Sequence, residues 1–178
     1  HVGGKFNLYF HGLISLLLDK HGFGSYFATQ RLISKIRRIK PDIVQIHSVH
    51  GYYINLKVLF TFLRKNSNIK VIWTQHDCWS FTGHCAHYED IACHKFETQC
   101  YSCPKISKYP KSLWRDNSRA NYIRKKQLLE SLENLQLVAP SKWLEIQFKR
   151  SFLKSYKVTH IANGIDIEVF RPHSDLEF

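Results

Sequence analysis

Lys70-Val-Ile-Trp-Thr74 followed by Gln75-His-Asp77 decides the fold of this chain. A short apolar run that ends on polar residues is typical of a buried strand that stops at the edge of a sheet. All five cysteines lie directly after it, between Cys78 and Cys103, so they belong to one local structure. The combination favours a site built at a sheet edge.

Helical and strand patterns alternate outward from this stretch with short connections. Ser25 and Ser141 are each placed to cap the helix that follows them. Residues 5–24 are helical in part, with turn glycines at their end. This alternation predicts an α/β fold, a Rossmann-like parallel sheet with helices on both faces. The predicted strands are 42–47, 70–74, 135–139 and 157–161, and the predicted helices are 25–39, 55–64, 118–132 and 141–153.

Polar residues follow each predicted strand. Because ligands collect at the carboxyl ends of parallel strands, we expect these residues to converge on one rim. His76 and Asp77 at this rim can form an acid–base pair, although adjacent residues on an extended segment point apart. Asn163-Gly164 predicts a tight turn. The rim residues are His47, Ser48, Gln75, His76, Asp77, Pro140, Ser141, Asn163 and Gly164, with His50 close by.

Four cysteines are spaced Cys85-x7-Cys93-x6-Cys100-x2-Cys103. The last pair can place two thiolates on one tetrahedral metal, and the first pair would complete a structural zinc site. Two disulfides would explain the same residues in an exported protein, and thiols that bind no metal are a third reading. Cys78 reads as a small buried residue.

The bulk composition describes a folded and strongly basic chain. It has 178 residues, a net charge of +12 and no apolar run long enough to span a membrane. Basic residues between Lys105 and Lys126 are interleaved with Tyr109, Trp114 and Tyr122, a pattern that suits phosphates, lipid headgroups or stacked bases. The chain contains no Met and begins with His1, so we expect a piece of a longer or processed protein.

Four ordered motifs resemble those of glycosyltransferase family 4. The GT-B enzymes of this family have two Rossmann-like domains that face each other across a cleft. The resemblance extends from about residue 20 to 172 and matches the second half of the N-terminal, acceptor-binding domain. The segment Trp79-Ser-Phe-Thr-Gly-His-Cys85 is similar to a branch found in bacterial capsule and exopolysaccharide gene sets. The motifs are Pro41-Asp-Ile-Val-Gln-Ile-His47, Thr74-Gln-His-Asp77, Ala139-Pro-Ser-Lys-Trp143 and Ile161-Ala-Asn-Gly-Ile-Asp166 with Phe170-Arg-Pro172.

This resemblance implies a retaining transfer of a sugar from a nucleotide-sugar donor to a glycan or lipid-linked acceptor. His76 takes the position of the histidine that lines the cleft near the transferred sugar, with Asp77 as its partner in chemistry. We expect substrate contacts from His47, His50, Trp79, Thr82, Gly83, Ser141, Asn163 and Gly164, and structural zinc at Cys85, Cys93, Cys100 and Cys103.

The same resemblance sets the expected domain layout and location. Residues 1–165 form the acceptor-side domain with a cysteine-rich insertion at about 78–112, and residues 166–178 begin the linker between domains. The family's first strand with its glycine-rich loop and its donor-binding second domain have no counterpart here, so the chain alone is expected to be inactive. We expect a cytoplasmic protein, peripheral at the inner face of an anionic membrane.

Two other readings compete with the acceptor-side domain. A zinc-containing basic module that binds nucleic acid fits the charge and the cysteines, but the polar residues at four strand ends disfavour it, and we expect no nucleic-acid partner. A GT-B remnant without activity fits the missing parts.

Overall fold

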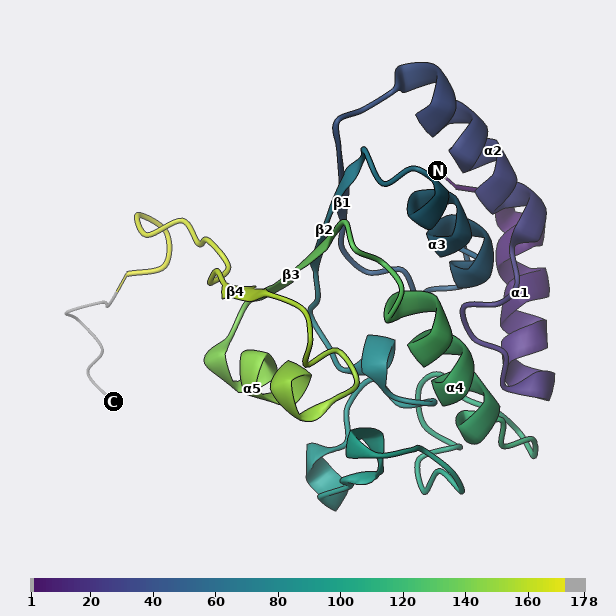
Figure 1. The fold of residues 1–178 in the computed structure, drawn as a ribbon. Coiled ribbons are helices and arrows are strands. Elements are labelled where there is room, and N and C mark those ends of the chain that lie inside the picture. Colours follow the sequence, from purple (N-terminus) through teal and green to yellow (C-terminus); the bar gives the residue numbers. More distant parts are fainter. Residues whose placement is uncertain (1, 172–178) are drawn as a thin grey trace.

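The structure, a computed structural model, describes residues 2–171. Its centre is a parallel sheet in which β1 to β4 lie side by side in chain order (Figure 1). Val71 lies opposite Val44 on one side and Leu135 on the other. The predicted Rossmann-like α/β class is confirmed, and each predicted strand is found. The strands are β1 (Ile43–Ile46), β2 (Lys70–Thr74), β3 (Leu135–Ala139) and β4 (Val158–His160).

Residues 2–171 also form five α-helices and three short 3-10 helices; α1 and α2 precede β1, and the others connect the strands. Asn55 and Ser141 cap α3 and α5, since the Asn55 side chain accepts from the Val58 amide at 3.1 Å and Ser141 Oγ from the Leu144 amide at 3.2 Å. No helix of residues 2–171 is long and apolar enough to cross a bilayer. The helices are α1 (Lys5–Leu18), α2 (Tyr26–Ile39), α3 (Leu56–Lys65), α4 (Ser118–Leu129), α5 (Lys142–Arg150), η1 (Trp79–Phe81), η2 (Glu89–Ile91) and η3 (Lys95–Glu97).

Ser25 does not cap α2 as predicted. It stands at the cap position with φ 55°, a left-handed conformation, and its side chain makes no bond to the helix. Its Oγ instead contacts His11 Nδ1 at 2.8 Å and accepts from the Asn7 amide at 2.9 Å. The residue is therefore a junction between α1 and α2, since its hydroxyl is engaged by α1 and not by the amides of its own helix.

The helices that follow β1, β2 and β3 cover one face of the sheet. With strands in chain order, right-handed crossovers carry each connecting helix to the same side. Leu63 of α3, Leu129 of α4 and Phe148 of α5 join one buried cluster with Val71 and Leu137 of the strands. The second helical layer expected on the other face is not found among residues 2–171, where Gln45 and Gln136 stay exposed.

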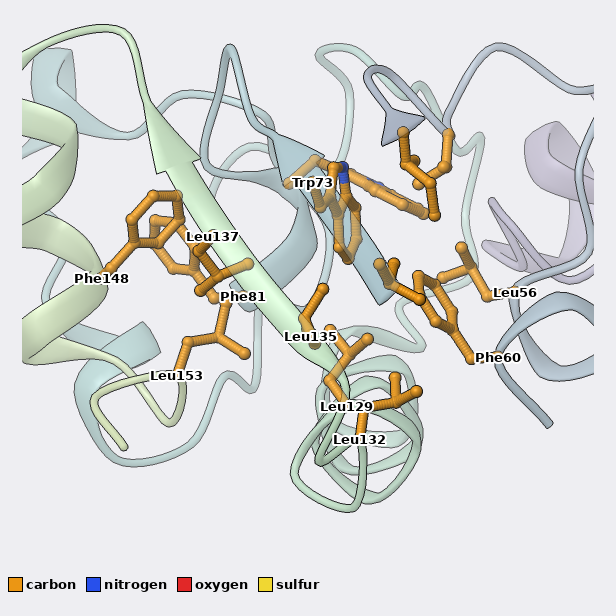
Figure 2. Close-up of a cluster of buried hydrophobic side chains, with 14 of the residues drawn as sticks. Leu56, Phe60, Trp73, Phe81, Leu129, Leu132, Leu135, Leu137, Phe148 and Leu153 are labelled. Carbon is orange, nitrogen blue, oxygen red and sulfur yellow. The ribbon is translucent and has the colours of Figure 1, made fainter. Parts of the chain in front are cut away.

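The cysteine loop, residues 78–112, contributes to this core rather than lying on it. Phe81 is fully buried, and its ring lies 5.4 Å from that of Phe148, beside Leu137 (Figure 2). Trp79 is 1% exposed, and the ammonium of Lys125 lies over its ring, 3.5 Å from the ring centroid, in a cation–π contact. Lys125 Nζ also donates to the Trp79 carbonyl at 2.6 Å, and burial lowers its pKa to about 7. The loop is thus fixed from inside.

Asp19 joins three segments that are distant in sequence. Its side chain is 1% exposed and accepts from His84 Nδ1 at 2.6 Å and from the Asn117 amide at 2.8 Å. Its backbone carbonyl accepts from the Asn121 side chain at 2.6 Å. The end of α1, the cysteine loop and the start of α4 therefore meet at one buried carboxylate.

The Asp19–His84 pair predicts a pH-dependent stability. Burial would lower the pKa of His84, but the hydrogen bond and charge of Asp19 raise it above its ordinary value. The folded state then holds the His84 proton more tightly than the unfolded state does. The stability that the Asp19–His84 pair contributes is fully present below the ordinary histidine pKa and is lost as pH rises through the raised pKa of His84. Asp19→Asn should cost about 3 kcal/mol at about pH 6 and less at about pH 9.

Urea unfolding followed by circular dichroism at both pH values measures this difference. Asp90→Asn is the matched control, because Asp90 pairs with Lys105 on an exposed surface and should leave the midpoint nearly unchanged. An equal loss at both pH values would show that His84 is not the group that titrates.

Candidate functional site

Polar residues from the ends of β1 and β2 converge, as the strand pattern predicted. His47 and His50 come from the segment after β1, and His76 and Asp77 from the segment after β2. The two segments form two contacts: His47 with His76, and His50 with Asp77. The predicted His76–Asp77 pair does not form, because Asp77 reaches across to the neighbouring strand end.

His50 is held between Asp77 and Tyr109. Its Nε2 lies 2.6 Å from Asp77 Oδ2, and its Nδ1 lies 3.0 Å from the Tyr109 hydroxyl. The other carboxylate oxygen of Asp77 accepts from the Trp79 amide at 2.8 Å, which orients the carboxylate. The ring of His50 rests 5.5 Å from that of Trp79. Both nitrogens of a partly exposed imidazole are therefore engaged.

The protonation of this triad follows from its surroundings. Burial opposes ionisation of Asp77, but the hydrogen bond and charge of His50 keep the pKa of the carboxyl below its usual value. An ionised Asp77 only accepts, so His50 Nε2 donates to it, and His50 Nδ1 faces the Tyr109 hydroxyl. Burial, with the nearby Tyr52 and Asp77, raises the pKa of Tyr109 to about 12, so its hydroxyl stays protonated.

A strained turn presents His50. Gly51 has φ 113° and Tyr52 has φ 67°, a left-handed conformation that is uncommon for an aromatic residue. The Tyr52 carbonyl accepts from Ser25 Oγ at 3.1 Å, and its ring lies 4.8 Å from that of His21. Backbone strain of this kind concentrates at functional sites, where the surrounding structure holds it.

His21 forms the floor beneath this turn. It is 2% exposed, its Nε2 accepts from the Gly51 amide at 3.3 Å, and its Nδ1 has no partner among the described residues. Burial, with the nearby charge of Lys125, lowers the pKa of His21 well below its ordinary value, so the ring is neutral. The rings of Trp79 and Tyr109 lie 5.0 and 5.6 Å away. These aromatic rings form a packed layer beneath His50.

His47 and His76 form a more open pair beside the triad. His47 Nδ1 lies 3.1 Å from His76 Nε2, and the rings are nearly parallel with centroids 5.4 Å apart. Gln45 approaches the second nitrogen of His47 at 3.2 Å. Both histidines are exposed. Two imidazoles this close share a single proton between their facing nitrogens, and they can donate to or accept from a bound hydroxyl.

Three of the expected substrate contacts are interior residues. Trp79 is buried below His50, and Thr82 Oγ1 donates to the Cys85 carbonyl at 2.5 Å. Gly83 packs so closely on Ser118 and Cys100 that it has no room for a Cβ. The loop folds inward at this point and places Thr82 and Gly83 away from the open rim, so their contact with substrate stays a prediction. Trp79 supports the site from below.

The other expected contacts lie towards the far end of the rim. Ser141 caps α5 at the end of β3, and Asn163 and Gly164 follow β4 on an exposed segment. The tight turn expected at Asn163-Gly164 is absent; the chain turns later, at 167–170. β4 lies three strand spacings from β1, roughly 14 Å, so these residues share the rim without joining the triad.

The structure does not support the predicted zinc site at the cysteines. All five are free thiols, and no group of three or more metal-ligating side chains within residues 2–171 is arranged to hold a metal ion. Cys85 is buried, and its contact with Cys103 lowers the pKa of the Cys85 thiol and raises that of Cys103. Zinc at Cys85, Cys93, Cys100 and Cys103 is therefore unsupported.

The basic stretch after the cysteines is not one surface. Tyr122 and Lys125 are buried in the core, and the Tyr109 hydroxyl contacts His50. Trp114 stays 72% exposed. Sequence reasoning missed Tyr109 and His21 as site residues, because neither follows a strand. The glycines around His21 were the single local signal, and they indicated a turn rather than a site.

Comparison with known proteins agrees with the geometry. The chain matches Glycosyltransferase Family 4 over residues 5–169. It is 31% identical over 157 residues to "Putative colanic acid biosynthesis glycosyl transferase WcaC" of Escherichia coli (strain K12). That alignment covers 85% of this chain and 37% of the relative, so the chain spans well under half of that protein's length. No solved structure matches the chain.

The chain belongs to glycosyltransferase family 4. Its parallel sheet, with polar residues gathered at the carboxyl ends of the strands, fits a partial GT-B domain of that family.

Gly83 provides a test of how tightly the cysteine loop is packed. A Cβ at this position would lie 2.8 Å from that of Cys100 and closer still to the Ser118 carbonyl oxygen. Gly83→Ala should therefore destabilise the fold by about 1–3 kcal/mol. Gly12→Ala is the control: it lies within α1 with open space around it and should stabilise by about 0.5–1 kcal/mol. Urea unfolding compares them; a neutral Gly83→Ala would mean that the loop is loosely held.

Proposed function

We propose that this chain is the acceptor side of a glycosyltransferase that builds a bacterial surface polysaccharide. The reaction would transfer a sugar from a nucleotide-sugar donor, with retention, to a glycan or lipid-linked acceptor. Family membership supports the reaction class, and the relative named for colanic acid biosynthesis supports the kind of product. The observation that carries the acceptor role is the Asp77–His50–Tyr109 triad at the strand ends.

The triad suits recognition of an acceptor hydroxyl. His50 Nδ1 contacts the Tyr109 hydroxyl, and Tyr109 is partly exposed, so an acceptor can reach this position. An acceptor hydroxyl that takes this place can donate to Nδ1 and accept from Tyr109. As its oxygen bonds the anomeric carbon, the bond from that carbon to the donor phosphate breaks and the nucleotide leaves. The hydroxyl proton then passes to His50, where Asp77 stabilises the imidazolium.

The His47–His76 pair would contact the transferred sugar. Both side chains are exposed at neighbouring strand ends, and each has ring nitrogens that can bond a sugar hydroxyl. This keeps the expected role of His76 in the reaction but gives it His47 as a partner in place of Asp77. Ser141, Asn163 and Gly164 lie further along the same rim, where a longer acceptor would extend.

The donor would be held mainly outside this chain. The chain spans 37% of the length of its relative, and its described rim offers histidines rather than a cluster of cations for a diphosphate. We therefore expect residues 1–165 to be the acceptor-side domain, residues 166–178 to begin a linker, and the chain alone to show little turnover. A cytoplasmic location, where nucleotide sugars are made, completes the proposal.

Substitution of His50 tests the triad. In the complete gene product, His50→Gln removes the proton acceptor and should lower kcat/KM by about 100-fold, as measured by nucleotide release in the presence of a glycan acceptor. His94→Ala is the control, since His94 is an exposed histidine of the cysteine loop that pairs with Glu97. Unchanged turnover in His50→Gln would remove His50 from the reaction.

Substitution of His76 separates a role in the reaction from one in folding. His76→Ala should lower turnover strongly, while the free energy of unfolding changes by no more than about 0.5 kcal/mol because the side chain is exposed. Turnover and urea unfolding measured on the same preparation give both numbers. A variant that loses stability but keeps its turnover would make His76 a structural residue.

A further inference from the structure

Gln75 is a buried amide directly after β2, and the sheet holds its backbone in place. The residue is 4% exposed, and its backbone amide donates to the Val138 carbonyl of β3 at 3.0 Å, which extends the pairing of the two strands past the end of β2. Ser80 of η1 is 2% exposed, and its hydroxyl donates to Gln75 Oε1. The backbone of Gln75 and one end of its side-chain amide are therefore fixed.

The other end of this amide has no hydrogen-bond partner in the protein. Gln75 Nε2 is buried and unpaired among residues 2–171. Acceptors at the same strand ends are already engaged: Asp77 bonds His50 and the Trp79 amide, and the His47 carbonyl accepts an indole N–H at 2.7 Å. Buried donors are nearly always paired, because an unpaired donor destabilises the fold. The fold thus keeps a buried donor that its own residues do not use.

Gln75 also lines a small cavity between the segments that follow β1 and β2. The cavity measures about 10 Å³, which is room for one water-sized group. Among the buried side-chain atoms of residues 2–171 that lack a partner, Gln75 Nε2 is the one whose residue lines this cavity. An unpaired donor and a space for one atom therefore occur at the same residue. The lining consists of residues 47–50, Trp73, residues 75–77, Trp79 and Ser80.

The surroundings of this cavity favour a neutral oxygen as its occupant. The N–H of Gln75 needs an acceptor, which disfavours a cation or an alkyl group. The Asp77 carboxylate lines the same cavity, and its charge disfavours an oxygen of a phosphate or a carboxylate. A hydroxyl meets both conditions. Its oxygen accepts from the amide, and its proton can be donated to the imidazole of His47 or His76, which also line the cavity.

We propose that Gln75 is a specificity-determining residue whose Nε2 donates to one hydroxyl of a sugar bound at the strand ends. The inference rests on the proposed function, because it assigns a donor to the substrate of that site. The hydroxyl belongs either to the transferred sugar or to the acceptor, since both bring hydroxyls to this rim. A sugar that lacks this hydroxyl would leave the buried amide unpaired and would therefore bind weakly.

Replacement of the amide together with its partner tests this role. Gln75→Leu with Ser80→Ala removes both members of the pair, so the urea midpoint of the 178-residue chain should stay equal or rise. In the complete gene product, the double variant should raise KM for one of the two substrates by at least about tenfold, as measured by nucleotide release with the other substrate saturating. The KM that changes shows whether the nucleotide sugar or the glycan acceptor carries the hydroxyl. Gln136→Leu is the matched control, because Gln136 of β3 is exposed and lies outside the cavity.

Monodeoxy analogues of that substrate give a second readout. The wild type should use one of them with a kcat/KM at least about tenfold lower, and the double variant should use it as well as the parent sugar. A lowered urea midpoint would show that Gln75 has a structural role, and an unchanged KM for both substrates would show that the cavity holds water only; either result overturns the inference. A wild type that releases no nucleotide would instead refute the proposed function, while the urea midpoint still tests whether the amide is unpaired.

Discussion

The buried carboxylate of Asp19 is the interaction on which the rest of the structure depends. It stands one residue past α1, yet its partners come from the cysteine loop and the segment before α4, through His84 and the Asn117 amide, while Asn121 of α4 bonds the Asp19 backbone carbonyl. A buried charge is tolerated only with such partners. Because all of them must be present together, α1, the cysteine loop and α4 can assemble in one arrangement. That arrangement sets the loop beneath the carboxyl ends of the strands.

The position of the cysteine loop in turn creates the site. The burial of Phe81 and Phe96 in the core stabilises the loop. Lys125 donates hydrogen bonds to the carbonyls of Trp79 and Thr82 and so fixes the position of η1. The chain then returns along the sheet edge and brings Tyr109 against His50. A loop of more than thirty residues without regular strands is thus rigid enough to contribute a hydroxyl to a site, because polar bonds fix what apolar packing stabilises.

Periodicity was sufficient to predict the strands and most of the helices, because the spacing of apolar residues within one element indicates which of its sides is buried. Roles that depend on a distant partner could not be predicted. Asp77 was paired with its neighbour His76, but the structure pairs it with His50 across the strand boundary. Ser25 has the composition of a helix cap, but α1 captures its hydroxyl. Spacing placed the cysteines on a metal, whereas the fold buries Cys85 against Cys103.

The helix α1, which buries His11 and Ser15 and leaves Phe6 and Phe10 exposed, shows why a helix can be predicted while its orientation is not. Apolar residues at helical spacing imply an apolar side, and the usual inference turns that side inward. Here the inward position is decided by Ser25 and the backbone amides of Gly22 and Gly24, which only polar side chains can satisfy. The same choice relates the two surfaces of the molecule. His11 lies on the inward side with its ring 5.8 Å from Tyr52, next to the triad. The outward apolar side and the strand-end site are therefore separated by about one helix diameter, roughly 10 Å. A single helix thus serves as the wall of the site on one side and as an exposed apolar face on the other.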